Sequence, residues 1–108
     1  MEGPNLRSLP RTLFHCPLEL RVGDQTLRRE QAHGNLSTHG LYLCAEQLPE
    51  GTPVHVHFTA NPPADMDGVV RFRDAEGIGI EFTAVSEADQ RSLDALIAEF
   101  AENEFPSA

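Results

Sequence analysis

Residues 68–82 read GVVRFRDAEGIGIEF and contain two short runs in which apolar and polar side chains alternate. The first run spans residues 68–73 and the second spans residues 78–82. Between them, the sequence from Asp74 to Gly77 is typical of a turn. Alternation with a period of two indicates a β-strand that buries one face. The stretch therefore predicts an antiparallel hairpin in a mainly β domain.

The sequence upstream of this hairpin has the same strand-like character. Alternating or apolar runs occupy residues 17–22, 41–44 and 54–58, and the polar segment 26–33 fits an edge strand. Turn-forming residues separate these runs, so successive strands are spaced by roughly ten residues. Short strands at this spacing indicate a β-barrel or a β-sandwich.

The end of the chain changes to a helical period. Ser86 is a good helix N-cap, and Asp89 follows it at a spacing close to that of a capping box. Apolar residues then recur at intervals of three and four, on one helical face: Leu93, Leu96, Ile97 and Phe100. We predict a helix over about residues 87–102 that packs its apolar face on the barrel.

Composition and charge exclude several classes of function. The chain has 108 residues, which is enough for one domain. Its formal net charge is −9, and all of its lysine and arginine positions are arginine. This acidity disfavours binding to DNA, RNA or an anionic membrane. No stretch is long and apolar enough for a membrane span or a signal peptide, and two cysteines do not make a disulfide framework. We therefore expect a cytoplasmic protein that is not inserted in a membrane.

Two short motifs carry side chains that suit a nucleotide ligand. Arg7 and Arg11 form an RxxxR in a proline-punctuated N-terminal segment. Further along, an NxSxxG motif leads into a strand and consists of Asn35, Ser37 and Gly40. Guanidinium groups bind phosphate oxygens and guanine edges, and amides and hydroxyls both donate and accept hydrogen bonds. Each motif alone also has an ordinary interpretation, as solvated arginines and as a turn.

Together the two motifs resemble the PilZ domain family, and the resemblance covers roughly residues 5–103. The hairpin at 68–82, with its G-[IV]-G-[IV]-x-F strand, and the Ser86-capped helix agree with it. The resemblance implies a mainly β fold, a six-stranded antiparallel PilZ-type β-barrel with a C-terminal α-helix. The chain over 1–108 is then a single PilZ-like domain in three parts: a flexible ligand-binding arm at 1–12, the barrel at 13–84 and the helix at 86–103.

The same resemblance implies a receptor for the bacterial second messenger cyclic di-GMP, with no catalytic activity and no further cofactor. Its ligand-binding residues carry over to the two motifs: Arg7, Arg11, Asn35, Ser37 and Gly40. Binding is expected to order the arm against the second motif, and an effector protein is expected to read the change. Leu6 stands where some family members have another basic residue, so we expect one ligand per chain. The alternative is a protein–protein adaptor that binds no nucleotide, and a homodimer remains open.

His55 and His57 raise a third hypothesis, a small metal-dependent enzyme. Alternation along a strand places both imidazoles on one face, which is the arrangement that a metal ion needs. The pattern is similar to the metal-binding HxH of cupins, but no carboxylate follows at the spacing that cupins use, and the alternating valines already explain the strand as half-buried. We therefore expect no metal ion at these histidines.

Two further candidates are set aside on similar grounds. His15 and Cys16 are neighbours in sequence, and adjacent strand residues point to opposite faces, so they do not form a Cys–His nucleophile. Asp65 and Asp67 have no acid–base partner in the sequence. We expect both of them in a solvated loop over residues 61–67.

Overall fold

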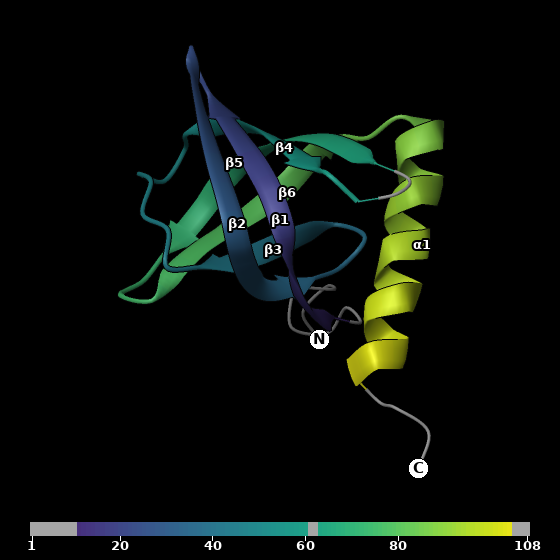
Figure 1. Ribbon diagram of the computed structural model, residues 1–108. Coiled ribbons are helices and arrows are strands. Elements are labelled where there is room, and N and C mark those ends of the chain that lie inside the picture. The colour runs from purple at the N-terminus through teal and green to yellow at the C-terminus, as the bar shows by residue number, and fades with distance from the viewer. Residues whose placement is uncertain (1–10, 61–62, 105–108) are drawn as a thin grey trace, which may run out of the picture.

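The computed structural model describes residues 11–60 and 63–104, which form six β-strands and one α-helix. Along the chain these are β1 (Thr12–Val22), β2 (Gln25–Leu36), β3 (Gly40–Cys44), β4 (Pro53–Phe58), β5 (Ala64–Arg73), β6 (Gly77–Ala84) and α1 (Glu87–Glu104). The strands pair antiparallel and close into a barrel in the order β1-β2-β3-β6-β5-β4 (Figure 1). The predicted six-stranded antiparallel barrel with a C-terminal helix is therefore confirmed.

The barrel interior is filled by alternate residues of the strands, as the period-two patterns predict. In the hairpin over residues 68–82, Ile78 and Ile80 of β6 are fully buried and Val70 of β5 is 1% exposed. Burial of each such side chain stabilises the fold by roughly 1.5–3 kcal/mol. The other large strand residues that are fully buried are Leu18, Leu20, Leu36, Leu41, Leu43, Val56, Phe58 and Met66. The core thus draws on all six strands.

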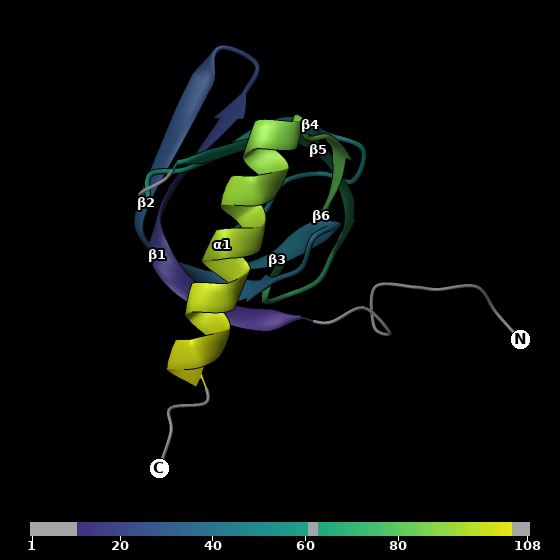
Figure 2. The same ribbon diagram turned by 90° about the vertical axis from the view of Figure 1, so that its right-hand side faces the viewer.

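Helix α1 lies across one end of the barrel (Figure 2). Leu93 and Leu96 of this helix are buried, and Ile97 and Phe100 are partly buried against the core. The ring of Phe100 lies 6.2 Å from that of Phe14 on β1, measured between centroids. The predicted apolar face is therefore the face that packs on the barrel.

The start of α1 is capped by the two residues that the sequence indicated. The Ser86 hydroxyl accepts a hydrogen bond from the backbone N–H of Asp89 at 3.1 Å and donates one to its carboxylate at 2.7 Å. The helix begins at Glu87 and ends at Glu104, slightly beyond the predicted end. In the part of the chain that the structure describes, no helix is both long and apolar enough to cross a membrane.

Strand β1 is longer than the sequence predicted. It begins at Thr12 rather than at residue 17, because its first half pairs with β2. Thr12, which the sequence assigned to the flexible arm, is buried and belongs to the barrel. The β1–β2 ladder changes register between Cys16 and Leu18, where Pro17 lies. Such an irregularity accommodates a residue that has no backbone N–H to donate.

The sequence predicted a solvated loop over residues 61–67, but the second half of this segment belongs to strand β5. The strand begins at Ala64 and pairs with β4 from there on. Ala64 and Met66 are buried, whereas Asp65 and Asp67 point outward. The Ala-Asp-Met-Asp sequence does alternate between apolar and polar residues. The prolines before it are typical of a loop, and its apolar content is small, so the alternation did not indicate a strand.

Strand β2 positions the second motif. Nearly its whole length pairs with β1, whereas only the segment from Gly34 to Leu36 pairs with β3. The predicted edge strand over 26–33 is part of this element, and the β1–β2 hairpin projects beyond the rest of the barrel (Figures 1 and 2). At the other end of the hairpin, Thr12 pairs with Leu36. The start of β1 therefore lies beside the β2–β3 connection.

Candidate functional site

The predicted site residues that the structure describes lie where β1 begins and β2 ends. Arg11 directly precedes β1, and Asn35 lies near the end of β2. Ser37 is in the connection to β3, and Gly40 is the first residue of β3. Arg7 and the rest of the arm up to residue 10 lie outside the described residues. Four of the five predicted residues are thus placed, and the fold brings Arg11 of the first motif and the second motif to one end of the barrel.

A hydrogen bond joins the two motifs directly. Nε of Arg11 donates to Oδ1 of Asn35 at 2.5 Å, across 24 positions of sequence. Partial burial lowers the pKa of the Arg11 guanidinium from its ordinary value, but an arginine stays charged in any case. The Asn35 oxygen keeps a second lone pair, and its amide nitrogen keeps donors. The pair thus presents a cation beside a group that both donates and accepts.

Ser37 is directed into the protein. Its side chain is buried, and its hydroxyl accepts a hydrogen bond from the backbone N–H of His39 at 3.2 Å. The same hydroxyl donates to the carbonyl oxygen of Gly40 at 3.4 Å, a bond at the long end of the range, and the backbone N–H of Ser37 donates to that oxygen at 2.9 Å. These contacts give Ser37 a role in shaping the turn between β2 and β3.

Gly40 is a glycine because β6 passes too close for a side chain. A Cβ atom at this position would lie 2.2 Å from the carbonyl oxygen of Ile80. The residue is buried and pairs with Glu81 in the β3–β6 ladder. Its backbone contact with β6 holds the end of the second motif against the barrel.

We expect Gly40→Ala to destabilise the fold. The new methyl group would push against backbone of β6, and overpacking of this kind costs roughly 1–3 kcal/mol. Urea denaturation measures the change, and Thr38→Ala in the same connection is the control, because Thr38 is exposed. An alanine variant as stable as the wild type would contradict the close approach of β3 and β6.

An open groove of about 1000 Å³ lies beside Asn35. Its lining comes from β1, β2, β3 and α1 and includes Leu13, His15, His33, Asn35, Tyr42 and Phe100. Leu13 is 61% exposed and contributes apolar surface to the groove. The groove therefore combines apolar surface with the polar Arg11–Asn35 pair at its edge.

Tyr42 and Phe72 form an aromatic pair near this groove that sequence reasoning missed. Their ring centroids are 6.0 Å apart and their planes meet at 20°. The Tyr42 hydroxyl donates to Asp74 at 2.6 Å, and this bond raises the pKa of the hydroxyl to about 12. One signal was available: a tyrosine between the buried residues Leu41 and Leu43 has to face outward.

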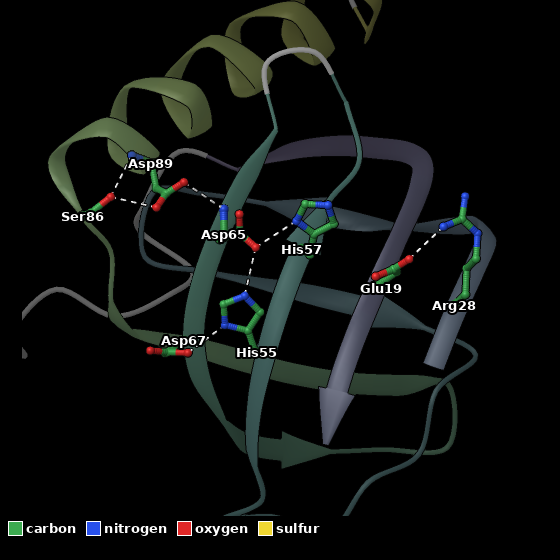
Figure 3. A network of polar contacts seen from close by, with 8 residues as sticks. All are labelled: Glu19, Arg28, His55, His57, Asp65, Asp67, Ser86 and Asp89. Carbon is green, nitrogen blue, oxygen red and sulfur yellow. Dashed lines mark hydrogen bonds and ion pairs between the residues drawn. The ribbon is translucent and has the colours of Figure 1, made fainter. Parts of the chain in front are cut away.

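A second polar cluster lies on the outer face of β4 and β5 (Figure 3). His55 Nδ1 bonds Asp67 at 2.8 Å, and His55 Nε2 bonds Asp65 at 2.9 Å. Asp65 also bonds His57 at 2.8 Å, and its backbone N–H donates to Asp89 at the start of α1. The two aspartates therefore do have partners, contrary to the sequence expectation. Among the described residues, no His, Cys, Asp or Glu side chains form a group suited to hold a metal ion.

His55 makes the stability of this cluster depend on pH. Both ring nitrogens face carboxylates, and only imidazolium donates from both. The hydrogen bond to Asp67, helped by Asp65, raises the pKa of His55 above 6.5 against the opposing effect of burial. Its contribution to stability is therefore complete below pH 6.5 and is lost as the pH rises through the folded-state pKa.

We expect His55→Gln to lower the free energy of unfolding by about 0.5–1 kcal/mol at pH 5.5 and by less at pH 8.5. The effect is small because the His55 side chain is 31% exposed. Urea denaturation at both pH values gives the difference, and His39→Gln is the matched control. An equal loss at both pH values would mean that the charge of His55 is not involved.

Cys16 is unsuited to nucleophilic chemistry. Burial and the neighbouring carboxylate of Glu99 raise the pKa of its thiol to about 11. The thiolate is the nucleophilic form, and very little of it exists at neutral pH. This agrees with the sequence argument against a Cys–His pair.

The fold and the site together define a small antiparallel β-barrel domain with two polar motifs joined at one end. The sequence model of the PilZ domain matches residues 5–99, so the chain belongs to the PilZ domain family. Among solved structures, the inhibitor of motility MotI/DgrA of Bacillus subtilis is similar, with a TM-score of 0.69 and 16% sequence identity. The match covers 97% of this chain and 56% of that one, and at this identity it shows a shared fold. No curated protein matches the sequence.

Proposed function

We propose that this protein is a receptor for cyclic di-GMP that signals to a partner protein in the bacterial cytoplasm and catalyses no reaction. The observation that carries the proposal is the hydrogen bond between Arg11 and Asn35, which joins the two motifs at one site. Membership of the PilZ family supports the choice of ligand.

The chemistry of the site suits a ligand with two phosphates and two guanines. The Arg11 guanidinium offers a planar set of donors for a phosphate or for the O6 and N7 atoms of guanine. Arg7 would add a second guanidinium four positions earlier in the sequence. Asn35 supplies an acceptor for the N1 and N2 donors of guanine, which an arginine cannot supply. Ser37 and Gly40 hold the turn that presents Asn35.

Local positive charge supports the same proposal. The chain carries a net charge of −9, so an anion would be repelled by most of its surface. An arginine fixed at the end of the barrel is therefore a selective place for an anionic ligand. Isothermal titration with cyclic di-GMP tests the proposal. Saturable binding of one ligand per chain is the expected result, and absence of binding would favour the nucleotide-free adaptor.

We expect the site to prefer cyclic di-GMP to cyclic di-AMP by about 2–3 kcal/mol. Adenine carries an amino group where guanine has O6, so a donor would face the arginine donors. Linear GMP should also bind weakly, because it lacks the second guanine and the constraint of the ring. Competition titrations with the three nucleotides measure this order. Equal affinity for the two cyclic dinucleotides would leave only a non-specific anion site.

A further inference from the structure

We infer that Tyr42, supported by Phe72, is the surface on which one guanine base of the ligand stacks. This inference rests on the proposed function and adds a residue that lies outside both sequence motifs. It follows from the position of Tyr42 in the sheet, from the way its ring is held and from the groove beside it.

Tyr42 is the immediate neighbour of the candidate ligand site. It lies directly opposite Asn35 in the β2–β3 ladder, and Leu13 lies opposite Asn35 on the other side, in the β1–β2 ladder. Side chains at opposed positions of an antiparallel pair stand about 4.5–5.5 Å apart at Cβ. A group bound at Asn35 is therefore within reach of the Tyr42 ring.

The ring of Tyr42 is held in place from the side away from Asn35. In that direction the next residue in register is Gly79 of β6, and Phe72 of β5 follows it. The Phe72 ring lies over Gly79, where a Cβ atom would come within 2.1 Å of it, and so reaches Tyr42. The Asp74 carboxylate accepts a hydrogen bond from the Tyr42 hydroxyl, and it also accepts hydrogen bonds from backbone N–H groups of its own turn. The aromatic surface is thus preorganised.

The groove provides the space for a base on the other side of Tyr42. Tyr42 and Asn35 both line it, and Leu13 adds exposed apolar surface. Its volume of about 1000 Å³ is at the upper end of the usual range for small-molecule sites. A guanine in this position would place its flat face on the ring of Tyr42 and its polar edge beside the Asn35 amide. A phosphate attached to the same nucleoside would then lie toward Arg11.

Stacking on an aromatic ring uses the face of a base and leaves its hydrogen-bonding edge free. The two kinds of contact therefore supplement each other at one guanine. From the usual strength of base–aromatic stacking, loss of the ring should weaken binding about 5- to 150-fold.

The test compares Tyr42→Leu with Tyr42→Phe in titrations with cyclic di-GMP. The leucine variant keeps an apolar side chain but removes the ring, whereas the phenylalanine variant keeps the ring and removes only the bond to Asp74. We expect at least a roughly fivefold loss of affinity for leucine and a much smaller loss for phenylalanine. Phe72→Leu should give an intermediate loss. Urea denaturation of each variant shows that the fold is intact.

Tyrosine fluorescence supplies a second readout that a purely structural role would not produce. The chain contains one tyrosine and no tryptophan, so its emission reports on Tyr42 alone. Stacking of guanine on the ring should quench this emission in proportion to the occupied sites, after correction for absorption by the ligand. Arg11→Ala, which disrupts the proposed site elsewhere, should shift the quenching to higher ligand concentration.

The outcomes separate this inference from the proposed function. If the wild type binds cyclic di-GMP but Tyr42→Leu binds equally well and the emission is unchanged, the stacking surface is wrong and the receptor function stands. Equal losses in Tyr42→Leu and Tyr42→Phe would assign the effect to the hydroxyl and overturn stacking. Absence of binding by the wild type would overturn both.

Discussion

Arg11→Ala is expected to weaken the binding of cyclic di-GMP by about 1.5–3 kcal/mol, which corresponds to roughly 10- to 150-fold. The variant removes a cation from the site where the two motifs are in contact, and it also removes the partner of Asn35. Arg7→Ala should have an effect of the same size. Isothermal titration measures both.

Arg21→Ala is the matched control for this experiment. Arg21 is an exposed arginine of β1 that lies at the far end of the β1–β2 hairpin, whereas Arg11 is partly buried at the near end. Loss of Arg21 changes the net charge by the same amount without touching the site. If the Arg11 and Arg21 variants bind equally, long-range charge rather than a local contact governs affinity, and the site assignment fails. If a double variant of Arg11 and Asn35 loses no more affinity for cyclic di-GMP than Arg11→Ala does, the two residues act together.

Leu96→Ala is expected to lower the free energy of unfolding by about 2–4 kcal/mol. Leu96 is 2% exposed and lies at the interface between α1 and the barrel, so the substitution removes buried surface and leaves a cavity. A loss of this size is a large fraction of the 5–15 kcal/mol that typically stabilises a domain. Urea denaturation followed by far-ultraviolet circular dichroism measures it.

The control for this prediction is Arg91→Ala on the exposed side of the same helix. It should change stability by no more than about 0.5 kcal/mol. Phe100→Ala should lower the free energy of unfolding by less than the truncation of a fully buried core side chain does. The reason is that Phe100 is only partly buried and one side of it lines the groove. Equal stability of the wild type and Leu96→Ala would mean that α1 does not depend on its contact with the barrel.

Local patterns predicted the strands wherever large apolar residues alternate with polar ones. The hairpin around Ile78 and Ile80 and the strand at residues 54–58 are examples. The helix was predictable because Ser86 and Asp89 mark its start and its apolar residues follow a single period. The prediction failed where a strand carries weak local signals, at the first residues of β1 and at the aspartates of β5. Pairing with neighbouring strands stabilises these segments, and such pairing is a long-range effect.

The candidate site was predictable in its composition but only partly in its roles. The motif pattern pointed to Arg11 and Asn35, and the fold brings them into direct contact. The pattern did not indicate that Ser37 turns inward or that Gly40 is required by the passage of β6. Both roles depend on contacts between segments that are distant in sequence.

The local sequence is therefore sufficient for a mainly β domain, the capped helix and the residue types of the two motifs. Each of these is encoded by neighbours within a few positions, where hydrophobic period and turn chemistry act. The pairing of Tyr42 with Phe72 and the histidine–aspartate cluster on β4 and β5 depend on the tertiary structure alone. Their neighbours are set by the register between strands, and a shift of one residue would turn each side chain to the other face of the sheet.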